Sequence, residues 1–239
     1  MCMKRRFTFS IFMVLLALAG LEGYGQSLTD YLAECERKYG RDADLVNGEK
    51  YFYPYSRTEG DPFFFSGAES SKIRIKGKDF EEQSLRYDIY NQLLVLDYED
   101  VYGGTTSLVL RKEWVESFSF GSVKFKGKTD SEGELIFYQV IMEGRVSCLY
   151  KWSKDYQLNL SSGEQNYYFT EPQKEAFLYI ADQFYPFKST RSFLNAFGEE
   201  QQKSIKQFIR EAKIKVKNAP DSQMRHLIEY CNSLPHEDS

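Results

Sequence analysis

The sequence of 239 residues predicts an α+β fold: an antiparallel β-meander, built as a twisted sheet, a sandwich or a partly open barrel, followed by a C-terminal cluster of short helices. Three observations support this. Apolar and polar residues alternate through most of residues 72–188, which is the period of half-buried strands. Glycine-containing turns separate these runs, with no helix long enough for a parallel crossover. From Ser189 onward the apolar spacing lengthens to nearly four, as in helices.

Residues 1–25 have the pattern of a signal peptide. A basic start at residues 4–6 precedes the apolar run 7–21, which is short for a membrane span, and Gly23 and Gly25 supply small residues before a cut. An uncleaved membrane anchor is the alternative. We therefore expect an exported protein, periplasmic, extracellular or associated with the outer membrane, with no transmembrane segment after cleavage.

The charge of the chain makes nucleic acid an improbable partner. The whole chain carries −4, and loss of three basic residues and one acidic residue with the leader leaves −6. A nucleic-acid-binding protein usually has a basic face and a high pI, whereas this pI is about 5.5. The clearest basic cluster is Lys213, Lys215 and Lys217, which alternate with Ile214 and Val216 and so predict the solvated face of a short strand.

Residues 26–71 are expected to form an N-terminal helix followed by an aromatic-rich loop segment. Apolar residues, among them Cys35, recur along one face from Ser27 to Tyr39, and Gly40 supplies the stop. The segment 47–65 then has the highest density of aromatic residues in the chain, interrupted by prolines and a glycine.

Aromatic rings at this density suggest a binding platform for sugar rings or peptide side chains, because rings offer rigid contact area at small entropic cost. Asp61 and Glu59 are candidate polar partners at its rim. In the alternative interpretation the rings simply anchor the loop into the sheet. The candidate binding residues are Tyr51, Tyr53, Tyr55, Phe63, Phe64 and Asp61.

Residues 72–188 are expected to form the antiparallel sheet. Its clearest part is a hairpin over residues 84–99, in which Leu85, Tyr87 and Ile89 face the core and Asn91 and Gln92 turn the chain. Strands are also predicted at 72–76, 105–110, 114–120, 123–126, 135–142, 145–152, 156–160, 167–169 and 177–180.

Three short helices are predicted over residues 189–234, packed on the sheet, with a disordered tail at 235–239. Ser189 or Thr190 caps the first helix, which Gly198 ends. Glu199 and Glu200 start the second favourably for its dipole. The third begins at Pro220 and Asp221 and carries an apolar stripe made of Met224, Leu227, Ile228 and Cys231.

The sequence contains no recognisable catalytic, metal or cofactor motif, so we expect no cofactor. Cys35, Cys148 and Cys231 form either one disulfide and one free thiol or three buried thiols, and each lies on an apolar stripe. His226 lies about 200° around its helix from Met224, and therefore faces away from Cys231.

A hydrolase that uses dispersed carboxylates is the alternative function. Asp97 and Glu99 share a strand face, and Asp100 follows, so a glycosidase-like pair is conceivable. Acidic residues that alternate along an exposed strand more often serve solubility.

The C-terminal run FIREAKIKVKNAPDSQMRHLIEYCNSL, Phe208 to Leu234, is similar to the end of an uncharacterised group of secreted Bacteroidota proteins, which close on a Y-x-N-S-L motif. LRYDIYN (85–91) and WVESF (114–118) resemble that group's strand-rich middle. The resemblance implies a secreted or cell-envelope protein without assigned activity, and the group's tyrosine at position 231 argues against a shared role for Cys231. We expect a non-enzymatic binding module for a protein or polysaccharide partner.

Overall fold

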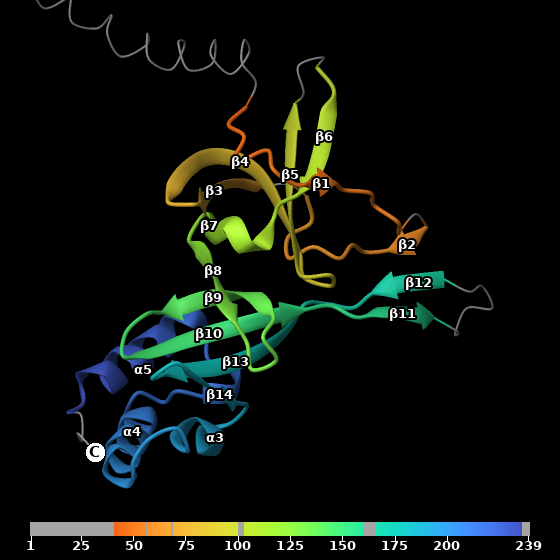
Figure 1. Ribbon diagram of the computed structural model, residues 1–239. Coiled ribbons are helices and arrows are strands. Elements are labelled where there is room, and N and C mark those ends of the chain that lie inside the picture. Colours follow the sequence, from red (N-terminus) through yellow and green to blue (C-terminus); the bar gives the residue numbers. More distant parts are fainter. Residues whose placement is uncertain (1–40, 56, 68, 100–102, 160–165, 236–239) are drawn as a thin grey trace, which may run out of the picture. The chain divides into compact units, whose positions relative to one another are not determined.

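The computed structural model describes residues 41–55, 57–67, 69–99, 103–159 and 166–235. The chain divides into two compact units, residues 1–43 and residues 44–239, and all described helices and strands belong to the second (Figure 1). The expected signal peptide, the expected helix at 27–39 with Cys35, and Asp100 lie outside the described residues, as does the expected tail apart from residue 235.

The second unit is built on one large sheet of eleven strands, and all its neighbouring strands are antiparallel. In spatial order the strands are β1 (Glu49–Lys50), β6 (Thr105–Val109), β5 (Leu93–Glu99), β4 (Lys78–Asp88), β3 (Glu69–Ile75), β7 (Val115–Phe120), β8 (Val123–Thr129), β9 (Leu135–Met142), β10 (Val146–Ser153), β13 (Gln173–Ile180) and β14 (Gln183–Phe187). The described part of the sheet is open, with β1 and β14 at its edges. The expected antiparallel sheet is confirmed.

The order of the strands departs from a simple meander at one point. After β3, β4, β5 and β6 pair in sequence, the chain passes through a short 3-10 helix, η1 (Lys112–Trp114), and β7 returns to the free side of β3. Further differences are the two edge strands: β14 was not predicted, and β1 lies in a segment expected to be a loop.

The predicted hairpin is β4 and β5. Leu85 pairs with Leu96 and Tyr87 with Leu94, and all four side chains are buried on one face of the sheet. Ile89 is also buried, and the turn at residues 89–92 contains Gln92 at a positive φ of 56°.

One face of the sheet is buried along most of its length. In the part of the sheet formed by β3, β4, β5, β7, β8 and β9, the side chains of this face pack on one another in a core rich in Phe118, Phe125 and Phe137. In the β9–β14 half it packs against the helices through residues such as Cys148 and Leu178. Trp152 contacts both cores and therefore joins them.

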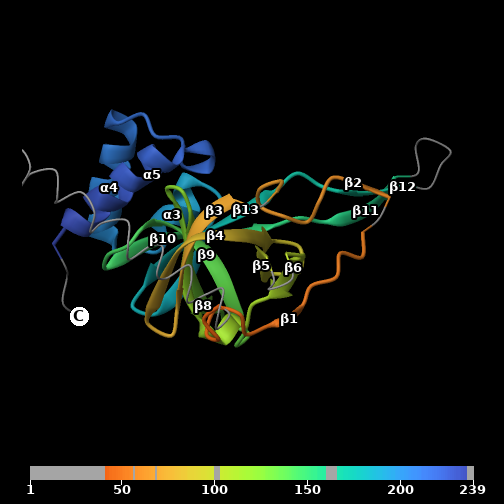
Figure 2. The ribbon, with the colours of Figure 1, turned by 90° about the horizontal axis from the view of Figure 1, so that it is seen from above.

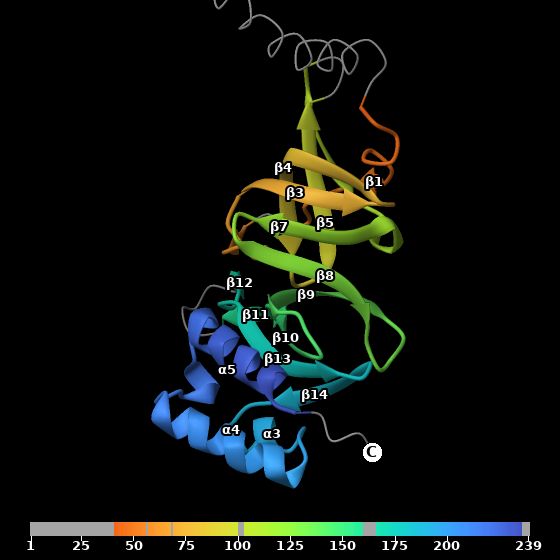
Figure 3. The same cartoon turned by 90° about the vertical axis from the view of Figure 1, so that its left-hand side faces the viewer.

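The C-terminal helices cover the second core (Figure 3). They are α3 (Thr190–Leu194), α4 (Glu199–Glu211) and α5 (Asp221–Ser233), and η2 (Val216–Asn218) is a 3-10 turn between the last two. Ser189 caps α3 in a reciprocal capping box with Ser192. The predicted stripe of α5 is buried, with α5 against β9 and β10 and α3 against β14. Among the described residues no helix is both long and apolar enough to cross a membrane.

Two local predictions are wrong. The segment 213–217, predicted as a strand, is instead the connection that follows the end of α4 at Glu211 and enters η2, although Ile214 and Val216 do face the core. The strands predicted at 156–160 and 167–169 do not extend the large sheet. They form a separate three-stranded sheet from β11 (Tyr156–Asn159), β12 (Asn166–Phe169) and β2 (Thr58–Glu59), in which β12 and β2 are parallel. Figures 1 and 2 show these strands extending beyond the end of β10.

Candidate binding surface

Phe63 and Asp61, two of the predicted binding residues, are held by contacts within the protein. Phe63 is 3% exposed, and its ring lies 4.6 Å from the guanidinium carbon of Arg86. Asp61 accepts a hydrogen bond from the Phe63 backbone N–H at 2.9 Å and forms an ion pair with Lys154 at 3.3 Å. Backbone bonds to Tyr87 and Ile89 dock this part of the segment beside β4.

Phe64 and Tyr51 are also anchored. The Phe64 ring makes edge contacts with Phe125 at 5.2 Å and Trp152 at 5.1 Å, so it packs on the core that contains Phe118, Phe125 and Phe137. The half-buried Tyr51 places its hydroxyl 3.5 Å from Asp88, and desolvation followed by the Asp88 charge raises its pKa. These rings hold the segment in place.

The remaining two predicted residues, Tyr53 and Tyr55, meet aromatic side chains from the β4–β5 turn and the three-stranded sheet. We call this group the aromatic ledge, which consists of Tyr53, Tyr55, Tyr90, Tyr156, Tyr167 and Phe169. Three elements distant in sequence thus supply one continuous set of rings.

Tyr55 is at the centre of the ledge. Its ring centroid lies 4.9 Å from that of Phe169 and 5.4 Å from that of Tyr156. Tyr156 stacks almost parallel on Tyr167, with centroids 5.0 Å apart and an interplanar angle of 10°. Phe169 is buried beneath the others, so it forms the base of the cluster.

The outer rings of the ledge are open to solvent. The exposed fractions are 43% for Tyr53, 39% for Tyr90 and 45% for Tyr167, and these three are among the few large hydrophobic side chains that the described chain exposes. Contiguous exposed apolar surface marks an interaction site more often than scattered single residues do.

A buried carboxylate fixes the geometry under the ledge. Asp88 is fully buried and accepts hydrogen bonds from the backbone N–H groups of Tyr90 and Asn91, at 3.0 and 2.8 Å. The Asn91 side chain donates to Asp88 at 2.8 Å and to the Tyr55 hydroxyl at 3.0 Å. Burial raises the pKa of Asp88, while the bonds from Asn91 oppose that shift. Asp88 therefore sets the positions of Tyr55 and Tyr90 together.

Sequence reasoning missed four of the six ledge residues. Tyr90 falls inside the predicted hairpin, just before the expected turn, with no role assigned to it. Tyr156, Tyr167 and Phe169 fall in predicted strands of the large sheet. The sequence does show that Tyr167 and Phe169 are two residues apart, which predicts that they share one face of a strand. It does not show which part of the chain lies against that face. The parallel contact between β2 and β12 brings them to the aromatic segment.

The acids of the alternative hydrolase are placed differently. Asp97 is bound by Arg86 through two bonds of 2.7 Å and by Ser107 at 2.5 Å, in a pair whose side chains are only 15–18% exposed. Glu99 is exposed near the end of β5. Asp97 is therefore occupied in a structural pair on the sheet.

The described cysteines and His226 do not form a reactive pair. Cys148 and Cys231 are free and buried, and desolvation raises the pKa of each to about 12, so both stay protonated thiols at neutral pH. His226 is exposed and lies against Phe208 with ring centroids 5.1 Å apart. Within the described ranges no group of His, Cys, Asp or Glu is arranged to hold a metal ion.

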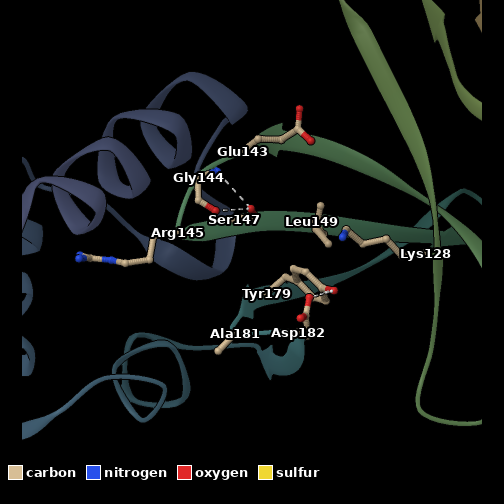
Figure 4. A pocket seen from close by; sticks show the side chains of 9 residues that line it. All are labelled: Lys128, Glu143, Gly144, Arg145, Ser147, Leu149, Tyr179, Ala181 and Asp182. Carbon is tan, nitrogen blue, oxygen red and sulfur yellow. Dashed lines mark hydrogen bonds between the residues drawn. The ribbon is translucent and has the colours of Figure 1, made fainter. Parts of the chain in front are cut away.

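A pocket of about 310 Å³ lies on the helix-free side of the sheet, over Ser147 and Leu149 of β10 (Figure 4). Lys128 reaches across it to within 3.7 Å of the Tyr179 ring centroid, and the Tyr179 hydroxyl donates to Asp182 at 2.8 Å. Figure 4 shows Arg145 directed away from the pocket. Lys128 and Asp182 both contact Tyr179, and Glu143 pairs with Lys126, so these charged groups already have protein partners. The pocket therefore gives no functional assignment.

Comparison with protein-family models, with curated proteins and with solved structures found no match.

Proposed function

We propose that the protein is an exported, non-enzymatic module of the cell envelope whose aromatic ledge binds a polysaccharide. The observation that carries the proposal is the gathering of six aromatic side chains from three elements on one surface, with three of them substantially exposed. The part of each ring that stays in water adds nothing to stability through burial.

The chemistry of the ledge matches that of a sugar ring. A pyranose presents apolar C–H faces, which pack on aromatic faces, and a rim of hydroxyl groups. Five of the six ledge residues are tyrosines, so each ring carries its own hydroxyl. Desolvation raises the pKa of Tyr53 and Tyr55, which keeps both hydroxyls protonated and able to donate as well as accept.

The ledge is also pre-organised. The ring of Tyr55 is fixed by Asn91 and by contacts to Tyr156 and Phe169, and the Tyr156 hydroxyl lies 3.3 Å from that of Thr58. Rings that are ordered before binding lose little entropy when the ligand arrives, which favours affinity.

Binding to soluble and insoluble polysaccharides, including glucans, xylans, mannans and peptidoglycan, tests the proposal. We expect retention on at least one of them, and loss of that retention in the double variant Tyr53→Ala/Tyr167→Ala. Phe65→Ala is the matched control, because Phe65 is an exposed ring of the same segment that contacts Phe64 and Phe120 instead of the ledge. Equal retention of the double variant and the wild type, or no retention on any polymer, would contradict the proposal.

A protein partner is the second candidate, and one observation favours it. β11 is an edge of the three-stranded sheet, and Leu158 on it is 38% exposed. An open edge strand can accept an extended peptide from a partner. Leu158→Lys should weaken capture of such a partner in pull-downs from envelope extracts, and the exposed-ring variant Phe65→Ala should not. Capture of a protein by the wild type, without retention on any polysaccharide, would favour this second candidate.

A further inference from the structure

We infer that α4 and the chain that follows it form a binding surface for an anionic lipid layer. The surface, called here the basic segment, spans residues 203–217 and carries six cationic side chains: Lys203, Lys206, Arg210, Lys213, Lys215 and Lys217. This inference goes beyond the proposed function and does not depend on the ledge.

The fold directs all six cations outward. In α4, Ile205 and Ile209 are buried against the helix core, and the cationic residues of the helix are exposed. Lys203, Lys206 and Arg210 fall on one stripe at spacings of three and four residues. Beyond the helix, Ile214 and Val216 are buried and alternate with Lys213, Lys215 and Lys217, so these three lysines are also exposed to solvent.

In the described part of the chain these six groups have no direct ionic partner. Throughout the described chain, none of the six cationic side chains makes an ion pair or a hydrogen bond. The one acidic residue in the segment, Glu211, accepts a hydrogen bond from Gln207 at 2.8 Å instead. Unmatched cations held close together raise the local potential and attract anions.

The rest of the chain has the opposite charge balance. The whole chain has 31 basic and 35 acidic residues, so removing six and one leaves 25 basic against 34 acidic residues outside the basic segment. An anionic surface therefore attracts this segment and repels much of the remainder, which would orient the protein as it binds.

The design of the segment suits a lipid surface better than one defined ligand. Five of the six cations are lysines, which act as mobile point charges, whereas recognition of a single phosphate or carboxylate favours the planar arginine fork. The hollow of about 480 Å³ on α4 is lined by Lys203, Lys206, Gln207, Arg210 and Glu211, with no aromatic platform for a sugar. Phosphate headgroups that move laterally can adjust to such a pattern.

Co-sedimentation with vesicles tests the inference. Wild-type protein should bind phosphatidylcholine vesicles that contain about one third phosphatidylglycerol and should not bind pure phosphatidylcholine. The triple variant Lys203→Gln/Lys206→Gln/Lys215→Gln should bind at least about tenfold more weakly, since each lysine near an anionic membrane adds to the attraction. Raising NaCl from about 0.05 to 0.5 M should release the wild type.

The matched control is Lys50→Gln/Lys72→Gln/Lys124→Gln, which removes the same charge from exposed positions on β1, β3 and β8. It should keep wild-type vesicle binding, as should the ledge variant Tyr53→Ala/Tyr167→Ala. Equal losses in both lysine triples, or equal binding to neutral vesicles, would overturn the inference. Binding to soluble polyphosphate without binding to the anionic vesicles would also overturn it, in favour of a polymeric anion.

Discussion

The two ends of the aromatic-rich segment have similar compositions, but their central rings lie in different environments. Residues 51–55 and 61–65 each hold one proline and at least three aromatic residues. In the second stretch Phe63 is buried and only the last ring, Phe65, is exposed, whereas in the first Phe52 is 73% exposed and Tyr53 is 43% exposed. Composition therefore does not separate anchor from binding surface in this segment.

Backbone pairing explains the difference. The N–H of Phe64 donates to Tyr87 at 2.8 Å and the N–H of Ile89 donates to Pro62 at 2.9 Å, so the second stretch is bound to the end of β4. The first stretch leaves the short edge strand β1 after Tyr51 and meets the three-stranded sheet by its side chains. The docked backbone buries Phe63 and packs Phe64 on the core, whereas the first stretch, which is not docked beyond Tyr51, leaves Phe52 and Tyr53 exposed to solvent.

The largest effect should follow from Phe63→Ala. Removal of a buried phenyl ring leaves a cavity, and the ring also covers the Arg86 guanidinium, so we expect a loss of about 3–5 kcal/mol in the free energy of unfolding. Denaturant titration measures it. A loss below about 1 kcal/mol would mean that Phe63 does not anchor the second stretch, and the contrast with Tyr53 would fail.

Much of the fold follows from local patterns in the sequence. The β4–β5 hairpin was predictable because its alternation continues through Leu85 and Tyr87 to a turn, and the α5 stripe because its spacing is helical. The ledge was not, because it depends on β2 meeting β12, a parallel contact of two residues on each strand separated by more than a hundred positions. Strands as short as these carry no periodicity that selects a partner.

Asp97→Ala should have the next largest effect. It leaves the Arg86 guanidinium, 18% exposed in its side chain, without its bidentate partner beneath the anchored stretch, and we expect a loss of about 2–3 kcal/mol. Thermal and chemical unfolding measure the loss. Asp97→Asn, which keeps one acceptor, should cost less. Unchanged stability in Asp97→Ala would instead reopen a functional role for this carboxylate.

Asp88→Ala should affect both stability and binding. The N–H groups of Tyr90 and Asn91 lose their acceptor, which should cost about 1–2 kcal/mol, and the position of Tyr55 is no longer fixed through Asn91. Polysaccharide retention should fall as well. Retention at the wild-type level would show that the ledge does not need this support.

The pH dependence of stability gives a separate measure of Asp88. Because burial raises its pKa above 3.8, the folded protein binds this proton more tightly than the unfolded chain does. The residue therefore adds stability as the pH falls through its raised pKa toward 3.8, and this contribution is absent at neutral pH. Relative to the non-titrating Asp88→Asn, the wild type should gain stability on acidification. A difference between the two that is independent of pH would contradict the raised pKa.

The smallest effect on stability belongs to Tyr53→Ala, and it completes the comparison with Phe63. Tyr53 is 43% exposed and touches Tyr55 and Phe63 at centroid distances of 5.5 and 6.3 Å, so its removal should cost less than about 1 kcal/mol. The same change should weaken polysaccharide retention, because an exposed ring is available to a ligand. Tyr53→Phe, which keeps the ring, should retain most binding if stacking dominates. A variant that unfolds readily or binds normally would place Tyr53 among the anchors, and the proposed division of the segment would be lost.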